Sequence, residues 1–335
     1  MAARIGINGF GRIGKLVLRL SLETPDLQVV QVNDPMGVEL MAHLLAYDSL
    51  HGKLPAKVGY DARGLLVDGR SIPVSGAASP AAIPWRQGQA EFVVEASGRF
   101  KDRPSLQGHL ENGARKVILS CPARDGSLDR TVVVGVNHHD LQPGDALISN
   151  ASCTTNCVAI MLRVLLDEFG VRRAFLNTIH PVTNNQNLQD GPHADFRRAR
   201  SAICNIIPTT TSAVPAVQTI FPELRGLFDG LATRVPVADC SFVELTAQLR
   251  RAARRQEINE AFRRHAAREL AGILEYVSDP IVSSDVGGNR HSAVFDSLAT
   301  KVLDGDLVQV LAWHDNETGY AARIIDLLRH LGERT

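Results

Sequence analysis

Short apolar runs alternate with segments of helical periodicity along the first half of the chain. Runs rich in Val, Ile and Leu occupy residues 4–8, 27–32, 64–67, 92–95, 116–119 and 131–136, and apolar positions recur at helical spacing in residues 15–22, 37–47 and 104–112. Short apolar runs are typical of buried strands, and helices between them return the chain to begin the next strand in the same direction. The pattern predicts an α/β arrangement, a largely parallel sheet with helices on its faces.

The second half of the chain has a different distribution of apolar residues. Residues 158–166 have helical spacing, residues 173–179 form a strand-like run, and a final helix is expected over residues 321–331. Residues 249–267 combine many arginines with an apolar stripe and interspersed glutamates. This combination predicts a helix with a solvated basic face rather than a nucleic-acid surface. A chain of 335 residues is long for one domain, so two domains are expected.

A glycine-rich segment lies between the first predicted strand and the first predicted helix. Its spacing is G-x-G-x-x-G, from Gly9 through Gly11 to Gly14. In dinucleotide-binding folds the three glycines permit a tight turn, close approach of a pyrophosphate and close packing of the helix. Asp34 follows twenty residues after Gly14, where a carboxylate binds the adenosine ribose and repels a 2′-phosphate. The segment predicts NAD binding; the alternative is a turn without a ligand, with Asp34 as a turn residue before Pro35.

One cysteine stands at the predicted start of a helix. Cys153 lies in the segment SNASCTTNC, residues 149–157, ahead of the apolar run at 158–166. Hydroxyl and amide side chains cap the free N–H groups of a first helical turn, and these N–H groups favour a thiolate, so we expect a lowered pKa for Cys153. The same N–H groups could bind a phosphate or an oxyanion. The alternative is a buried structural cysteine, which is our interpretation of Cys157.

Candidate partners for the thiol follow in the same half of the chain. His180 ends a predicted strand and is held extended by Pro181, so it is a candidate base, although a lone histidine is also common in cores and on surfaces. The polar loop 190–200 carries three arginines and precedes the hydroxyl-rich segment 207–212. Guanidinium and hydroxyl groups bind phosphate oxygens, and a solvated basic loop is the alternative. Arg234 stands in an apolar context and needs an anionic partner if it is buried.

Composition narrows the possible classes of function. Thirty-six basic residues balance thirty-six acidic ones, so net charge provides no bulk attraction to nucleic acid, membranes or acidic partners. Five scattered cysteines predict free thiols in a reducing compartment, and no metal site is expected because no histidine pair has ligand spacing near them. The first residues lack a signal-peptide pattern and no apolar run approaches membrane-spanning length, so a cytoplasmic location is expected.

Six motifs make the chain resemble the phosphorylating glyceraldehyde-3-phosphate dehydrogenase family. They are INGFGRIG, SNASCTTNC, a histidine twenty-seven residues after Cys153, NIIPTTT, ATRVP and DNETGY, in the family's order and spacing. The resemblance implies a Rossmann-type doubly wound parallel sheet in residues 1–152, completed by a C-terminal helix at 317–335. It implies an α+β catalytic domain at 153–316 with a mixed, mainly antiparallel sheet. It also implies a homotetramer, in which the loop at 181–205 reaches a neighbouring subunit's cofactor.

The resemblance implies chemical roles for the matching residues. Cys153 would add to the aldehyde of glyceraldehyde 3-phosphate as a thiohemiacetal, and His180 would activate the thiol and transfer protons. Hydride would pass to NAD, and inorganic phosphate would release 1,3-bisphosphoglycerate from the thioacyl enzyme. The expected cofactor contacts are Gly9, Gly11, Arg12, Ile13, Gly14, Asp34, Ser120 and Asn316. The expected phosphate contacts are Thr183 and Arg234 for the substrate, and Ser152, Thr154, Arg198, Thr211 and Ser212 for inorganic phosphate.

The chain departs from the family pattern near both ligands. Ser212 stands where the family has Gly, and Pro215 where Lys is common. We expect Ser212 to reshape the inorganic-phosphate site, because Gly permits backbone geometries that Ser resists. Residues 77–80 lack the basic residue often found against the adenine, so a reduced NAD affinity is expected.

Three alternatives to the main functional prediction stay open. Residues 33–35, 136–139 and 180–186 are similar to a branch that accompanies arsenate-resistance transporters, in which arsenate replaces phosphate and gives 1-arseno-3-phosphoglycerate. Erythrose-4-phosphate dehydrogenase is the second, although Thr183 favours the three-carbon substrate. The third is an NAD-binding scaffold without activity, against which intact Cys153 and His180 argue.

Overall fold

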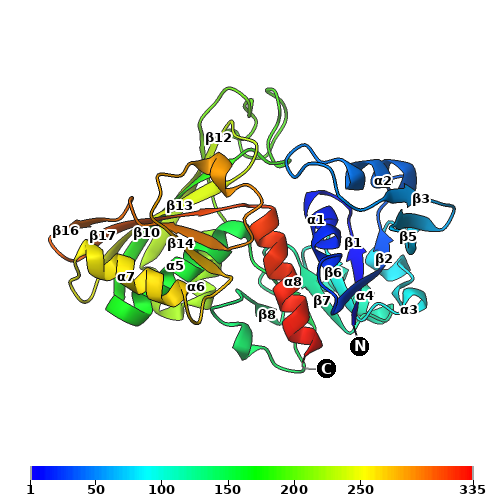
Figure 1. Ribbon diagram of the computed structural model, residues 1–335, viewed down its shortest axis with the longest axis horizontal. Helices are drawn as coiled ribbons and strands as arrows, with labels where there is room; N and C mark the ends of the chain where they lie inside the picture. Colours follow the sequence, from blue (N-terminus) through cyan, green and yellow to red (C-terminus); the bar gives the residue numbers. More distant parts are fainter. Residues whose placement is uncertain (1, 334–335) are drawn as a thin grey trace. The chain divides into compact units, whose positions relative to one another are not determined.

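The computed structural model describes residues 2–333, which divide into two compact units. The first contains the described parts of residues 1–151 and 321–335, and the second is Ser152–Tyr320. Figure 1 labels the elements of both. Each unit is built on its own sheet.

The sheet of the first unit is predominantly parallel. Within the described residues it has nine strands, in the spatial order β3 (Val58–Tyr60), β4 (Gly64–Val67), β5 (Arg70–Ser75), β2 (Leu27–Asn33), β1 (Ala3–Asn8), β6 (Phe92–Glu95), β7 (Lys116–Leu119), β9 (Leu147–Ser149) and β8 (Arg130–Thr131). All neighbours from β5 to β8 pair in parallel, and only the β3–β4–β5 edge is antiparallel. The order runs outward from β1 in both directions, which confirms the doubly wound Rossmann-type prediction.

Helices of the first unit are α1 (Arg12–Ser21), α2 (Val38–Ala46), α3 (Trp85–Gly88), α4 (Arg103–Glu111) and, from Ala321 onward, α8 (Thr318–Gly332). Helix α4 begins where Asp102 accepts a hydrogen bond from the Ser105 N–H. Trp85 and Leu106 are fully buried and anchor α3 and α4 in two apolar clusters with strand residues. Arg329 pairs with Asp26 (Nε–Oδ2, 2.8 Å), which ties α8 to the start of β2.

The second unit has a mixed sheet with mainly antiparallel neighbours, as predicted. Its described strands, in spatial order, are β11 (Ile207–Thr209), β12 (Phe228–Val235), β10 (Val171–Pro181), β13 (Ser241–Leu249), β17 (Leu307–His314), β15 (Ala293–Asp296) and β14 (Leu274–Val277), with β16 (Lys301–Leu303) paired to β17. Only β10–β12 and β14–β15 are parallel within the described part of this sheet.

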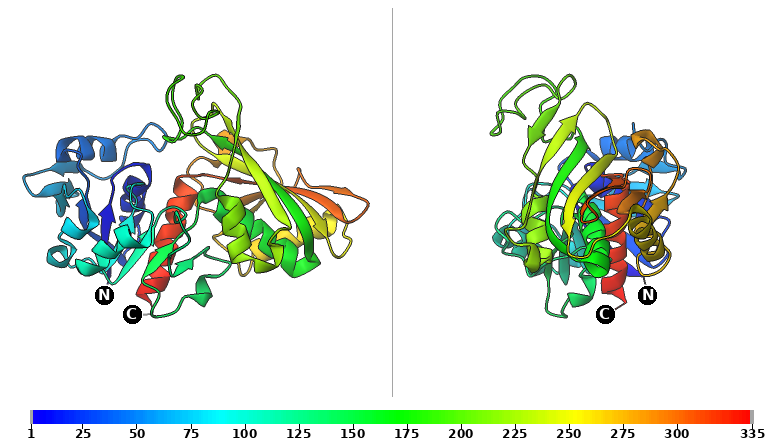
Figure 2. Two further views of the ribbon diagram at one scale, coloured as in Figure 1. Left: turned by 180° about the vertical axis from the view of Figure 1, so that it is seen from behind. Right: turned by 90° about the vertical axis from the view of Figure 1, so that its left-hand side faces the viewer.

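One face of the second sheet is covered by α5 (Cys153–Phe169), α6 (Ala213–Ile220) and α7 (Arg255–Ala266), which the left view of Figure 2 shows below the strands. Side chains along β17 alternate between buried and partly exposed, so every second residue faces these helices. On the opposite face large apolar side chains stay exposed, including Phe175 (66%) and Leu231 (44%). A long connection between β10 and β11 extends away from the sheet, green in Figure 1.

One predicted strand was wrong, and one predicted helix is present but begins later than expected. In place of the predicted strand at 131–136 there is a two-residue strand followed by a turn. The side chain of Asn137 binds the backbone groups that a longer strand would use: its Oδ1 accepts from the Val133 N–H (2.8 Å) and its Nδ2 donates to Thr131 O (3.0 Å). The predicted helix at 249–267 begins only at Arg255, since Leu249 pairs with Val171 at the end of β13.

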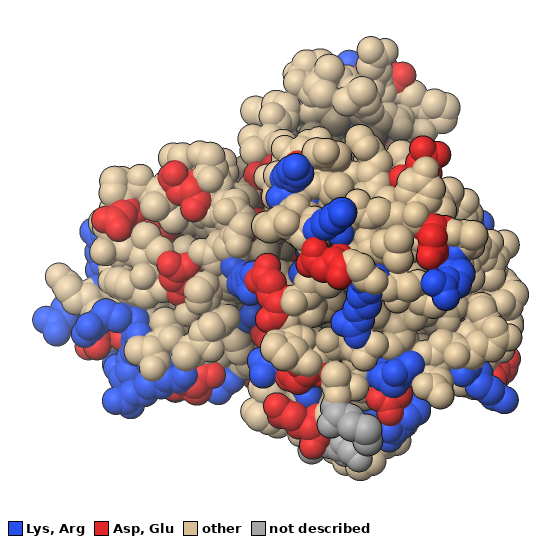
Figure 3. All heavy atoms as spheres, turned by 45° about the vertical axis from the view of Figure 1, so that its right-hand side comes forward, with Lys and Arg blue, Asp and Glu red and all other residues tan. Residues whose placement is uncertain are grey.

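Charged side chains of both signs are spread over the surface that Figure 3 shows, and basic and acidic side chains lie intermixed there. Among residues 2–333, no helix combines the length and apolarity needed to span a bilayer.

Candidate active site

The glycine-rich turn connects β1 to α1 and leaves a cavity above the strand ends. Gly9 has φ +93°, and a Cβ there would lie 2.4 Å from the Ser97 backbone. A Cβ on Gly14 would lie 2.0 Å from the carbonyl oxygen of Gly9, so α1 can pack this closely only with glycine. At Gly11 a Cβ would meet no described atom within 4 Å, because this residue opens onto the cavity.

The cavity lies at the carboxyl ends of β1, β2 and β6, on both sides of the point where the strand order reverses. Its volume is about 280 Å³, and its walls include Gly9, Gly11, Asp34, Ala77 and Ser97. Asp34 is held by two backbone amides: Oδ2 accepts from Phe10 N–H (2.7 Å) and Oδ1 from Met36 N–H (2.8 Å). A carboxylate has about four acceptor positions, so further hydroxyl groups can still bind Asp34.

A buried polar network forms the floor of this cavity. Glu95, fully buried, accepts hydrogen bonds from Asn8 Nδ2 (2.5 Å), from the Ser97 N–H (2.8 Å) and from the ring of His109 (Nε2–Oε2, 3.0 Å). Trp85 Nε1 donates to His109 Nδ1 (2.9 Å), so a neutral His109 carries its proton on Nε2 and donates it to Glu95. Asn8 and Ser97 also line the cavity, and the network therefore holds two of its walls in place.

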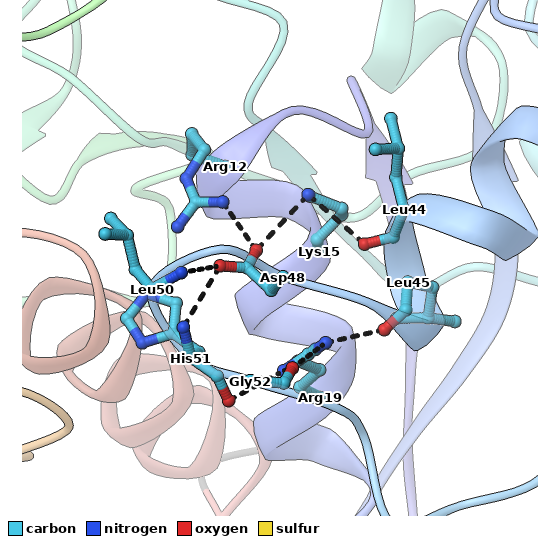
Figure 4. Close-up of polar contacts among 9 residues, drawn as sticks. All are labelled: Arg12, Lys15, Arg19, Leu44, Leu45, Asp48, Leu50, His51 and Gly52. Carbon is cyan, nitrogen blue, oxygen red and sulfur yellow. Dashed lines mark hydrogen bonds and ion pairs between the residues drawn. The ribbon is translucent and has the colours of Figure 1, made fainter.

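Arg12, an expected cofactor contact, has its side chain in an ion-pair cluster. Its guanidinium pairs with Asp48 (NH1–Oδ2, 2.5 Å), which also faces Lys15 Nζ at 3.4 Å (Figure 4). Burial raises the pKa of Asp48, but hydrogen bonds from Arg12 and from the N–H groups of Leu50 and His51 outweigh it, and the pKa lies well below its usual range. Three expected cofactor contacts are not among the described residues that line the cavity: Arg12, Ile13 and Ser120.

The cysteine segment of the second unit has the predicted local structure. Cys153 is the first residue of α5, and Ser152 caps the helix by accepting from the Thr155 N–H (3.1 Å), which confirms the predicted helix start. Residues 157–162 are buried, so the helix is anchored in the core. The Cys153 residue keeps some exposed surface, although the protein packed around its thiol desolvates the sulfur.

Strand β10 brings His180 to the thiol. Cys153 Sγ lies 3.6 Å from His180 Nε2, and His180 is 95% buried. The Nδ1 atom of His180 lies 2.9 Å from the carbonyl oxygen of Pro181 and contacts the guanidinium of Arg234. Arg234 is the cross-strand partner of His180 in the β10–β12 ladder, and its NH1 also donates to Pro181 O (3.0 Å). The thiol, the imidazole and the guanidinium thus form one contiguous group.

The expected low pKa of Cys153 is wrong for this structure. Burial raises the pKa of the thiol, and the opposing effects of Arg234 and of the Thr154 N–H and hydroxyl do not outweigh it. Burial, and then Arg234, lower the pKa of His180 well below its usual range. Burial also lowers the pKa of Arg234 to about 10, while the thiol favours its charge. The resting pair is therefore a neutral thiol facing a neutral imidazole at neutral pH.

The remaining anion-binding candidates lie around β11 and α6. Arg198 donates from Nε to Thr209 Oγ1 (2.9 Å) and from NH2 to Thr210 O (3.0 Å), and it also lowers the pKa of Arg234. The Thr211 hydroxyl accepts from the Ala213 N–H (3.2 Å). Ser212 has φ −73°, a conformation that any residue adopts.

Two further expected contacts hold loop positions in the second unit. The Thr183 hydroxyl accepts from the Asn185 N–H (3.4 Å) in the long connection after β10. Asn316 Oδ1 accepts from the Ser241 hydroxyl (3.3 Å) just after β17. Neither is bonded to the thiol group within the part of the chain that the structure describes.

Comparison with known proteins settles the family. Residues 3–103 match the model of the glyceraldehyde 3-phosphate dehydrogenase NAD binding domain, and residues 152–316 match that of the C-terminal domain. Glyceraldehyde-3-phosphate dehydrogenase 1 of Bacillus subtilis is 46% identical over 336 residues, covering 100% of this chain and 99% of its own length. The enzyme of Geobacillus stearothermophilus is 45% identical (100% and 99% covered), and that of Mycobacterium avium 46% (99% and 99%). The chain belongs to the glyceraldehyde-3-phosphate dehydrogenase family.

Membership of the glyceraldehyde-3-phosphate dehydrogenase family confirms an NAD-dependent oxidoreductase, and the cavity of the first unit suits this cofactor. The open side of Gly11 admits a pyrophosphate and the spare acceptor positions of Asp34 suit ribose hydroxyls. Ala77 and Ala78, from the segment 77–80 that lacks a basic residue, form an apolar wall of the cavity together with Met36. NAD supplies a hydride acceptor when it is bound.

Sequence reasoning missed three polar residues of this family's cofactor domain: Asn8, Asn33 and Glu95. Asn33 Nδ2 donates to Asn8 Oδ1 (2.8 Å), so these residues link the ends of β1, β2 and β6. A signal was present, because each is a polar residue at the carboxyl end of an otherwise apolar strand run. In a parallel sheet such ends meet at the ligand-binding edge.

Proposed function

We propose that the protein oxidises glyceraldehyde 3-phosphate with NAD and inorganic phosphate to 1,3-bisphosphoglycerate, through a covalent intermediate on Cys153. The observation that carries this proposal is the 3.6 Å approach of Cys153 Sγ to His180 Nε2 at the start of α5. The two units would act as the cofactor domain and the catalytic domain. The relatives named above carry the name of this activity.

His180 handles the protons of the proposed reaction. A guanidinium can only donate, so while Arg234 contacts His180 Nδ1 that nitrogen is the acceptor. Once the substrate's phosphate draws Arg234 away, a proton on Nδ1 donated to Pro181 O leaves the Nε2 lone pair facing the thiol. Nε2 accepts the thiol proton as sulfur attacks the aldehyde carbon, and returns it to the new oxyanion, giving the thiohemiacetal. When hydride leaves that carbon, Nε2 takes the hydroxyl proton and a thioester forms. The elevated pKa of Cys153 makes this coupled transfer necessary, because little thiolate is present beforehand.

Two anions need two cationic sites in this proposal. Arg234 and Thr183 hold the substrate's phosphate, and drawing Arg234 toward a phosphate relieves its contact with His180 Nδ1. Arg198, Thr211, Ser152 and Thr154 position the inorganic phosphate that attacks the thioester, and Ser212 stands beside them. This attack expels the Cys153 thiolate, and the proton that Nε2 of His180 took in the hydride step returns to the sulfur.

The test is NADH formation with purified protein, NAD, glyceraldehyde 3-phosphate and either phosphate or arsenate. We expect acceptor-dependent turnover that Cys153→Ser abolishes and Cys204→Ser, a control at an exposed thiol of the same unit, preserves. A strong preference for arsenate would move the role to the arsenate-using alternative. Turnover only with erythrose 4-phosphate, or NAD binding without any turnover, would contradict the substrate assignment.

We also propose a homotetramer. The support is the apolar surface that one copy leaves exposed: Phe175 and Leu231 on the open sheet face, and Phe196 (88%) and Ile206 (72%) on the connection between β10 and β11. Analytical ultracentrifugation should give four times the mass of the chain. Phe175→Glu should lower this mass, whereas a wild-type protein that sediments as a monomer would contradict the assembly.

A further inference from the structure

A second buried imidazole stands beside His180. His314 is the last residue of β17 and is 1% exposed. Its side chain faces the helix-covered side of the sheet, as that of His180 does at the end of β10. Strand β13 runs between β10 and β17, and its residue Ser241 pairs with His314. Two strand spacings separate β10 from β17, about 9.5 Å. The ring centroids are only 6.4 Å apart, so the two rings lean toward each other.

The ring of His314 differs from the other buried imidazoles. His109 is bonded through both nitrogens to Trp85 and Glu95, and His180 to Cys153 and Pro181. Neither Nδ1 nor Nε2 of His314 has a hydrogen-bond partner among the described residues. Buried polar side chains in native proteins nearly always have a partner, so an unpaired donor and acceptor beside a thiol site indicate a ligand.

The chemistry of that ligand follows from the ring's charge state. Burial lowers the pKa of His314 to about 3, so the ring is neutral at neutral pH and offers one N–H donor and one acceptor. A neutral ring beside His180 carries no charge and is not suited to bind phosphate. It is suited to an uncharged hydroxyl, which also donates once and accepts.

We propose that His314 binds the 2-hydroxyl group of the aldehyde substrate and so contributes to substrate specificity. This inference rests on the proposed function, in which the phosphate is assigned to Arg234 and Thr183 and the aldehyde oxygen to His180. The 2-hydroxyl is then the one hydroxyl group of glyceraldehyde 3-phosphate, and it has no assigned partner. It stands on the carbon next to the one that Cys153 attacks. His314, adjacent to His180, supplies that partner.

The decisive experiment compares substrates with and without this hydroxyl. kcat/KM is measured for glyceraldehyde 3-phosphate and for 3-oxopropyl phosphate in wild type and in His314→Phe, which keeps a ring but removes both nitrogens. We expect the preference of the wild type for the hydroxylated substrate, roughly threefold to tenfold for one uncharged hydrogen bond, to fall to about one in the variant. His314→Gln, which keeps a donor and an acceptor, should restore part of it.

Controls separate binding from folding. His265→Phe replaces another buried imidazole of the same unit and should leave the preference unchanged. Thermal unfolding and Cys153 alkylation by iodoacetamide verify that His314→Phe is folded with an intact thiol site. A variant that is folded and keeps the wild-type preference would overturn the proposal.

A binding measurement distinguishes this inference from the proposed function. Glycerol 3-phosphate and propane-1,3-diol monophosphate, which lacks the hydroxyl, are compared for protection of Cys153 against alkylation. If the wild type turns over neither aldehyde but is protected better by glycerol 3-phosphate, and His314→Phe loses this difference, the inference stands and the proposed activity fails. Equal protection by both compounds in the wild type refutes the inference.

Discussion

The network under the cofactor cavity makes a quantitative prediction for His109→Phe. Phenylalanine keeps the ring volume but removes both nitrogens, so the hydrogen bond to Glu95 is lost and the Trp85 N–H is left unpaired in the core. A hydrogen bond to a carboxylate contributes about 1.5–3 kcal/mol, and an unpaired buried donor costs about 1–3 kcal/mol. We expect the free energy of unfolding to fall by roughly 3–5 kcal/mol.

The expected loss is large against a typical total stability of about 5–15 kcal/mol. Urea unfolding followed by circular dichroism measures it, and NAD titration tests the consequence for the cavity. Because Glu95 also holds Asn8 and Ser97, which line the cavity, we expect NAD to bind several-fold more weakly. His43→Phe, at an exposed position of the same unit, should change the unfolding free energy by less than about 0.5 kcal/mol. A change below about 1 kcal/mol in His109→Phe would refute the reasoning.

Three other substitutions test the charges of the two units. Arg234→Leu removes a cation that lowers the pKa of Cys153, so this pKa should rise further. The rate of Cys153 alkylation near neutral pH should then fall several-fold, measured as a pH–rate profile. An unchanged profile would contradict the influence of Arg234 on the thiol. Asp34→Ala should raise the Kd for NAD about tenfold and reduce the discrimination against NADP, both measured by titration. Unchanged discrimination would show that Asp34 does not bind the ribose. The folded-state pKa of Asp48 is depressed, so its stabilisation is present above its unfolded pKa of about 4 and is lost as pH falls toward the folded value. Asp48→Asn should therefore lower the unfolding free energy at pH 7 by about 3 kcal/mol and flatten its acid dependence, and equal acid dependence in both proteins would contradict the pairing with Arg12.

Much of the fold was accessible from local patterns. The runs at residues 92–95 and 116–119 coincide with β6 and β7, because a short Val- and Ile-rich run between polar turns has few other stable states. The start of α5 followed from Ser152, whose hydroxyl meets the free N–H groups of the first turn. The differences at 131–136 and 249–254 come from interactions that a hydrophobic pattern does not show. The side chain of Asn137 binds backbone groups that a longer strand would use, and the pairing of β10 with β13 extends to Leu249.

The sequence by itself determined the alternation of strands and helices, the glycine turn and the helix start at Cys153, because these depend on residues close together in the chain. Tertiary structure alone decided that β12 places Arg234 beside His180 and that β17 places an unpaired His314 near His180. It also reversed the expected pKa direction of Cys153, since burial depends on everything packed around α5 and not on the helix terminus alone. Register and burial arise from contacts between residues far apart in the chain, and the chemistry of the site depends on both.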